Sequence, residues 1–227
     1  MPTIGIPFKY YHLKDDRCIL YLGEKMRRCV QKAGGFVLPL VPVQDVDYMD
    51  TKYHDFQEFT EKEKEEIEKY LDMVDGVLFP GGYKLTPWDE YLLKRCIERN
   101  IPTLGICLGM QMMGGYPNGI QTDKLEDDSH FQESDEELSH MVKIKRDSKL
   151  YEILGKEEIL VNSFHHYHIK SSHLFETTAV SHDGIIEAVE LPNHIFCVGV
   201  QWHPEVSYDF DENSKKMIDA FINTCQK

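Results

Sequence analysis

The segment TLGICLGMQMMGG, residues 103–115, sets Cys107 in a Gly-x-Cys-x-Gly pattern between a short apolar run and a Met-rich stretch of helical character. A strand that turns sharply into a helix presents its corner residue in a strained conformation. Gly105 and Gly109 lack the Cβ atoms that would crowd such a turn. The positive end of the following helix favours a thiolate. The pattern predicts a nucleophile at Cys107, although a buried cysteine ending a strand would share this spacing.

A second segment supplies the groups that a cysteine nucleophile needs. VGVQWHPE, residues 198–205, holds His203 and Glu205 with only Pro204 between them. A thiol requires a base to take its proton, and the base requires a partner that orients it. A His-x-Glu pair alone is typical of an ordinary protein surface. Together with Cys107, it predicts a catalytic triad of Cys107, His203 and Glu205.

Alternating apolar runs and helical patterns are expected to position these residues. They predict an α/β fold with a mainly parallel central sheet flanked by helices, and a smaller antiparallel part in the second half. The acidic segment 120–140 is expected to be an exposed excursion. Expected strands lie at 3–6, 36–40, 76–79, 103–106, 141–145, 158–162, 184–190 and 195–202, and expected helices at 22–33, 57–73, from Pro87 after an N-cap at Thr86, and from Asn213.

Composition limits the classes of function. The 227 residues suit one domain spanning 1–227, and the net charge of −14 argues against binding to nucleic acid or to an anionic membrane. No apolar stretch approaches the roughly 18 residues that suggest a membrane span. The six cysteines form no Cys-x-x-Cys pair, which is typical of free thiols in a reducing compartment, so a cytoplasmic location is expected.

Several motifs resemble one enzyme superfamily. GICLGMQ at 105–111, QWHPE at 201–205 and LFPGG at 78–82 are similar to the class I glutamine amidotransferases, whose Cys-His-Glu triad hydrolyses a γ-glutamyl amide through a thioester. The resemblance covers most of the chain and implies a flavodoxin-like α/β fold and no cofactor. Four stretches look like the γ-glutamyl-γ-aminobutyrate hydrolase branch, peptidase C26: PTIGI at 2–6, AGGFVLPL at 33–40, VNSFHHYHI at 161–169 and DGIIEAVE at 183–190.

The resemblance assigns the remaining parts of the site. The oxyanion that forms on the attacked carbonyl is expected to accept hydrogen bonds from the backbone N–H groups of Leu108 and Gly82. No metal is expected, because no carboxylate or thiol lies near the histidines at 165, 166 and 168 in the sequence. The residues expected to bind the substrate are Gly81, Gln111, Asn162, Ser163, Phe164 and His165.

Three positions depart from the pattern of the branch. Lys84 stands where an Asp is usual, Leu108 where an Arg is usual, and Tyr167 where a Gln often follows the histidine pair. These changes leave the thioester chemistry intact. They fall on the leaving-group side of the substrate, which is expected to face Tyr83, Lys84 and Tyr167.

The expected function is cysteine-dependent hydrolysis of a γ-glutamyl amide in a small molecule. The alternative is a glutaminase subunit that delivers ammonia to a separate synthetase, and only this alternative requires a synthetase partner. A homodimer is left open. A non-catalytic binding protein is disfavoured because all three triad residues are present. A serine-hydrolase-like fold with Cys in place of Ser is disfavoured because Glu205 follows His203 almost at once.

Overall fold

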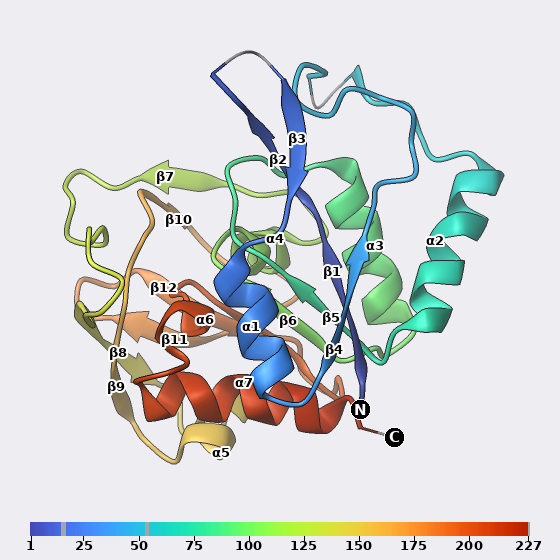
Figure 1. The fold of residues 1–227 in the computed structure, drawn as a ribbon. Coiled ribbons are helices and arrows are strands. Elements are labelled where there is room, and N and C mark those ends of the chain that lie inside the picture. Colours follow the sequence, from blue (N-terminus) through green and yellow to red (C-terminus); the bar gives the residue numbers. More distant parts are fainter. Residues whose placement is uncertain (15–16, 53–54, 227) are drawn as a thin grey trace.

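A nine-stranded sheet forms the centre of the computed structural model, which describes residues 1–14, 17–52 and 55–226 (Figure 1). The first five strands across it are parallel and the rest are antiparallel, which confirms the predicted α/β fold and its smaller antiparallel part. In order, the strands are β4 (Phe36–Leu40), β1 (Thr3–Pro7), β5 (Gly76–Phe79), β6 (Thr103–Ile106), β13 (Cys197–Val200), β12 (Ile186–Glu190), β11 (Glu176–Ser181), β8 (His140–Ile144) and β9 (Glu158–Val161).

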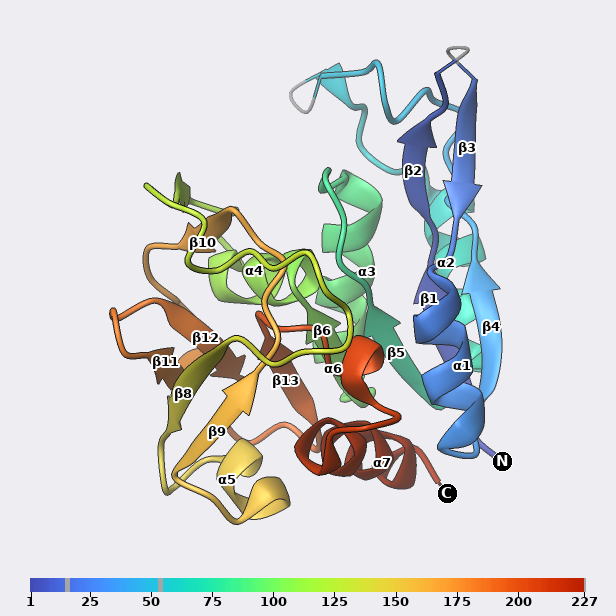
Figure 2. The same cartoon turned by 60° about the vertical axis from the view of Figure 1, so that its left-hand side comes forward.

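Helices cover both faces of the sheet (Figures 1 and 2). Side chains alternate between the faces of a strand, so in β5 Leu78 contacts one apolar cluster while Val77 and Phe79 contact the other. The cluster around Leu78 includes residues of α1 (Glu24–Lys32), α5 (Lys149–Leu154) and α7 (Glu212–Thr224), with the short α6 (Pro204–Ser207) beside α1 and α7. The other cluster includes residues of α2 (Glu61–Met73), α3 (Pro87–Glu98) and α4 (Leu108–Gly115).

Local signals set the helix ends. Thr86 caps α3 as expected, and its capping box is closed by Asp89. Thr60 and Glu63 form the same box at the start of α2. Gly34, at φ +90°, follows the end of α1 in a conformation that favours glycine. These ends agree with the predicted helices to within a few residues.

Two small two-stranded sheets, of which one is a hairpin, were not predicted. Strands β2 (Lys9–His12) and β3 (Cys18–Tyr21) pair and project beyond the end of β1, and β7 (Thr122–Lys124) pairs with β10 (Tyr167–Ile169). The acidic excursion 120–140 is largely exposed, as expected, but it carries one buried residue, His130. Both pairs lie outside the nine-stranded sheet. In Figure 2 the β2–β3 hairpin rises at the upper right, and the excursion, in yellow-green, runs along the left and through the centre.

No helix within the described ranges has both the length and the apolar character needed to cross a membrane.

A buried ion pair connects the start of the hairpin to α3. Lys9 Nζ donates to Asp89 Oδ1 at 2.8 Å, and both side chains are almost fully buried. Lys9→Met leaves the carboxylate of Asp89 buried without its cation, so we expect the free energy of unfolding to fall by about 3–5 kcal/mol. Urea denaturation measures this loss. Lys64→Met, which breaks an exposed pair with Glu61, should cost no more than about 1 kcal/mol, and equal losses in the two variants would contradict the prediction.

Candidate active site

The predicted triad lies at the carboxyl ends of adjacent parallel strands. Cys107 directly follows β6, His203 lies shortly after β13, and the turn Pro80–Gly82 follows β5. Because parallel strands end at the same edge of a sheet, these segments meet there. They line a cleft of about 510 Å³. The cleft lining also includes Lys9, Tyr21, Leu22, Gly23, Glu24, Lys25, Met26, Tyr83, Phe131, Phe164, Glu205 and Val206.

Cys107 occupies a strained corner between β6 and α4. Its backbone has φ 52° and ψ −106°, which confirms the predicted unusual conformation and costs on the order of 1–3 kcal/mol. A Cβ on Gly109 would lie 2.5 Å from the carbonyl oxygen of Phe79, and one on Gly105 would lie 2.8 Å from the backbone carbon of Gly109. The two glycines therefore allow the close backbone contacts that the turn requires.

His203 connects the thiol to a carboxylate. Its Nδ1 lies 2.7 Å from Glu205 Oε1, and Cys107 lines the same cleft close enough to affect the charge state of the ring. A Cβ on Gly81 would lie 2.9 Å from Cε1 of His203 and 3.3 Å from Cβ of Cys107, so this glycine leaves room for the pair. The ring of Phe164 stands edge-on to the imidazole, with centroids 5.5 Å apart.

The surroundings of His203 favour the imidazolium form. Burial alone would lower its pKa, but the charge of Glu205 and the hydrogen bond and charge of Cys107 outweigh burial and raise the pKa well above the ordinary value of a histidine. An imidazolium beside Cys107 can stabilise a thiolate and can later give its proton to a leaving amine. The arrangement is therefore suited to nucleophilic catalysis.

The other buried thiols have different surroundings. Burial raises the pKa of Cys96 and of Cys225 to about 12, and it raises the pKa of Cys197 and Cys29 as well. These groups stay neutral and inert near neutral pH. Cys107, in contrast, is partly exposed in the cleft.

Part of the expected substrate-binding set lies at the cleft. Gly81, Gly82 and Phe164 line it together with the triad. Leu108 begins α4, so its N–H is one of the first amides of that helix, which have no partner within the helix. The oxyanion-hole roles of Gly82 and Leu108 are compatible with these positions.

Asn162 is placed differently from the expectation. Its side chain is fully buried, where Oδ1 accepts from the N–H of His203 at 2.8 Å and Nδ2 donates to the carbonyl of His203 at 2.8 Å and to Ser207 Oγ at 3.1 Å. A buried amide is paired within the protein because an unpaired one is costly. Asn162 therefore holds the backbone of His203 and has no free side-chain group to offer a substrate.

We expect Asn162→Ala to act on the position of His203. Removing both contacts lets the imidazole shift, and a displacement of about 1 Å costs on the order of 10²-fold in kcat. Steady-state kinetics should show this loss in kcat with little change in KM, and Asn162→Asp, which keeps the acceptor for the His203 N–H, should recover part of it. Asn213→Ala, at a surface contact with Lys156, is the control. A lower stability with unchanged kcat would limit Asn162 to a structural role.

Gln111, Ser163 and His165, also expected to bind the substrate, lie outside the cleft lining. Gln111 Nε2 donates to the carbonyl of Tyr167 and to Gln201 Oε1, so its amide bridges α4 to neighbouring segments. Ser163 Oγ donates to the carbonyl of His130, and its N–H donates to Gln132 Oε1. All three side chains are buried and none belongs to the cleft lining. The amide nitrogen of Gln111 and the hydroxyl of Ser163 are thus paired within the protein.

The leaving-group side differs as well. Lys84 Nζ donates to the carbonyls of Met49 and Thr51, so its ammonium group binds the loop after β4. Tyr167 lies against residues 124–128, and only Tyr83 of the three expected residues reaches the cleft. Sequence reasoning missed Lys9 and Phe131. The position of Lys9 just after the run that became β1, at the same sheet edge as Cys107, was the available signal.

Comparisons with known proteins identify the family. The peptidase C26 family profile matches residues 86–205. The chain is 33% identical over 191 residues to the gamma-glutamyl-gamma-aminobutyrate hydrolase of Escherichia coli O157:H7, covering 70% of this chain and 75% of that enzyme. It is 28% identical over 167 residues to the CTP synthase of Chlamydia abortus, covering 60% of this chain and 31% of the synthase.

A solved structure shares the fold. The glutaminase domain of Trypanosoma brucei CTPS with bound acivicin superposes with a TM-score of 0.62 at 16% identity, covering 99% of this chain and 92% of that one.

Proposed function

This chain belongs to the peptidase C26 family of the class I glutamine amidotransferase superfamily, and from that premise we propose that it hydrolyses a γ-glutamyl amide bond through a thioester on Cys107. The observation that carries the proposal is the cleft position of Cys107, at a strained strand-to-helix corner, beside a histidine that is itself held by a carboxylate.

In the first half of the reaction, Sγ of Cys107 attacks the γ-carbonyl carbon as a thiolate. The carbonyl oxygen becomes an oxyanion, for which the N–H groups of Gly82 and Leu108 are the proposed donors. The imidazolium of His203 gives its proton to the amide nitrogen, the C–N bond breaks, and the amine leaves. The product of this half is a γ-glutamyl thioester.

In the second half, water replaces the amine. Neutral His203 takes a proton from the water as the oxygen attacks the thioester carbonyl. The C–S bond then breaks, glutamate is released, and the thiolate–imidazolium pair is restored. Glu205 keeps Nδ1 protonated and thereby directs Nε2 toward the reacting groups, as their contact of 2.7 Å allows.

The proposal is tested by incubating the pure protein with glutamine and with γ-glutamyl derivatives of neutral, acidic and cationic amines, while glutamate release is measured. Rapid quenching and intact-mass analysis should detect one γ-glutamyl group on the protein. Release of glutamate without any covalent intermediate, even at short times, would contradict the cysteine mechanism.

The same assay separates the alternative, a glutaminase subunit of a separate synthetase. Leu108 after the nucleophile resembles ordinary amidotransferases, and the CTP synthase relative combines a matching segment with a longer chain. Turnover of glutamine alone, accelerated by an added synthetase, would favour that role. Efficient turnover of γ-glutamyl amines by the isolated protein favours the hydrolase.

A further inference from the structure

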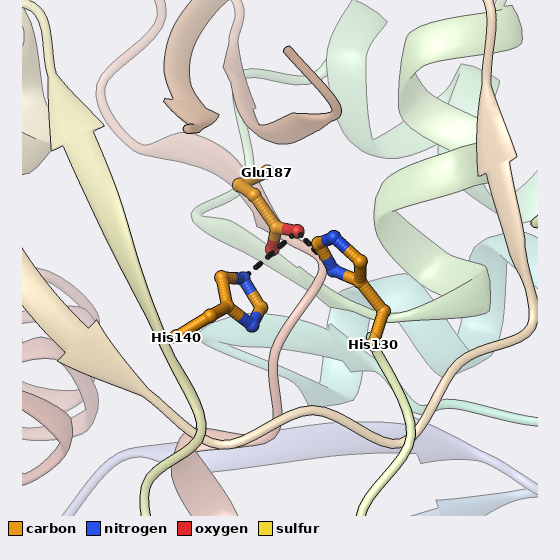
Figure 3. Close-up of side chains that lie close together, drawn as sticks. All are labelled: His130, His140 and Glu187. Atoms are coloured by element: carbon orange, nitrogen blue, oxygen red, sulfur yellow. Dashed lines mark ion pairs between the residues drawn. The ribbon is translucent and has the colours of Figure 1, made fainter. Parts of the chain in front are cut away.

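Three histidines surround one buried carboxylate away from the cleft lining. Glu187 on β12 is fully buried, and its Oε1 lies 3.2 Å from Nδ1 of His130, 3.2 Å from Nε2 of His140 and 3.6 Å from Nε2 of His165. Figure 3 shows His130 and His140 approaching the carboxylate from two separate segments. One ligand atom from each of His130, His140 and Glu187 lies within 4.8 Å of the others.

The far nitrogens of two rings fix which atoms face Glu187. Nδ1 of His165 lies 3.1 Å from the carbonyl oxygen of Tyr167, which can only accept, so this nitrogen donates. Nε2 of His130 lies 3.0 Å from Oδ2 of Asp183 and donates likewise. In a neutral imidazole only one nitrogen carries a proton. In the neutral form, the nitrogens of both rings that face Glu187 therefore present lone pairs to a carboxylate that also presents lone pairs. Burial acts to lower the pKa of His130, but the nearby carboxylates of Glu187 and Asp183 outweigh burial and raise that pKa, so a proton competes with a metal ion for this place.

No hydrogen bond of acceptable geometry joins the three histidines to Glu187. Within residues 1–14, 17–52 and 55–226, neither oxygen of Glu187 has a hydrogen-bond partner. The same holds there for Nδ1 of His130, for both nitrogens of His140 and for Nε2 of His165. Buried polar atoms are rarely left without a partner. Convergent lone pairs of imidazole and carboxylate are the donor set that zinc takes in proteins.

We propose that His130, His140 and Glu187 bind one Zn²⁺ ion, with His165 beside them. Zinc lies about 2.0–2.2 Å from nitrogen and oxygen ligands, so the ligands of a tetrahedral site are about 3.3–3.6 Å apart. The contacts of 3.2 Å that His130 and His140 each make with Glu187 are close to that spacing. Asp183 holds the outer nitrogen of His130, as second partners of zinc-bound histidines do.

The site would be structural, because its three protein ligands lie outside the cleft lining. His130 is the buried residue of the acidic excursion, whereas His140 and Glu187 belong to the antiparallel strands. Phe131 and Phe164, which respectively follow His130 and precede His165 in the sequence, pair in an isolated antiparallel β-bridge. Both residues line the cleft. The ion would thus attach the excursion to the sheet and fix this part of the cleft. No metal was expected because no carboxylate lies near the histidines at 165, 166 and 168 in the sequence, whereas Glu187 approaches His165 only in the folded chain.

Zinc binding is tested on Cys107→Ala, so that the thiol and His203 cannot together bind the ion. The protein is stripped with a chelator and titrated with Zn²⁺ in a calorimeter, and the metal content is measured after dialysis. We expect one zinc per chain and a midpoint of thermal unfolding that rises with zinc concentration. Co²⁺ in place of zinc should give the absorption of a tetrahedral site without a thiolate charge-transfer band.

Matched variants locate the site. His130→Gln and His140→Gln should each weaken zinc binding by at least about 100-fold, and Asp183→Asn by about 10- to 100-fold. His166→Gln and His168→Gln, which alter nearby histidines outside the cluster, should bind zinc as the parent does. Because Glu187→Gln can fail to fold, the histidine variants and the cobalt spectrum carry the test.

Two results would overturn the proposal. One is that the stripped protein takes up no zinc, which would show that protons shared between the histidines and Glu187, and no metal ion, hold the cluster together. The other is zinc uptake that persists unchanged in both His130→Gln and His140→Gln. Neither result depends on γ-glutamyl hydrolysis, since binding is measured in a variant without the nucleophile.

Discussion

Cys107→Ala is expected to lower kcat/KM for γ-glutamyl substrates by at least about 10⁴-fold, because without the thiolate no thioester forms. Stability should change little, since alanine keeps the same Cβ at the strained corner and the thiol is partly exposed. Stopped assays of glutamate release measure the loss, and intact-mass analysis should no longer detect the acyl group.

The control for this variant is Cys18→Ala, which removes an exposed thiol of the hairpin and should leave turnover and acylation unchanged. If Cys107→Ala retained more than a few per cent of the parent activity, the cysteine mechanism would be wrong.

Glu205→Gln is expected to lower kcat by about 10²- to 10⁴-fold, because the amide no longer fixes the tautomer or stabilises the charge of His203. The charge of Glu205 raises the pKa of His203, so its removal lowers that pKa. His203 then loses its proton at a lower pH as the pH rises. The alkaline limb of the kcat/KM profile, which requires the imidazolium, should therefore move to lower pH.

A pH series of kcat/KM on the parent and the variant tests this shift. Glu212→Gln, at the exposed start of α7 where the carboxylate contacts Lys216, is the control and should keep the parent profile. An alkaline limb that stays in place in Glu205→Gln would show that Glu205 does not set the charge of His203.

Local patterns predicted the centre of the fold and the strained corner at its edge. Short apolar runs became β1, β4, β5 and β6. Strands β1, β5 and β6 are buried on both faces, which requires continuous apolar sequence, whereas β4 lies at the sheet edge and is partly exposed. The corner at Cys107 was predictable because Gly105 and Gly109 meet backbone atoms too closely for any Cβ. Such features depend on residues close in sequence or on a single strand-to-helix turn.

The hairpin and the partners of buried polar groups could not be predicted in the same way. The stretch that became β2 and β3 mixes polar and aromatic residues without a clear period. Asn162 and Gln111 were expected to bind a substrate. In the structure their side chains donate to the backbone carbonyls of His203 and Tyr167, which are 41 and 56 residues away in the sequence. Pairing of buried polar groups is decided by three-dimensional neighbours, which a sequence pattern does not contain.

The nucleophile and its base are attached to neighbouring strands in the middle of the sheet. Cys107 N–H donates to the carbonyl of Val200 at 2.8 Å, so β6 and β13 stay in register up to the residues that carry the chemistry. The hairpin and the excursion contribute the outer wall of the cleft from outside this sheet. Insertions, deletions and substitutions in these two segments can therefore accumulate during evolution without moving sulfur relative to imidazole, so that relatives can diverge in substrate while inheriting one unchanged reaction centre.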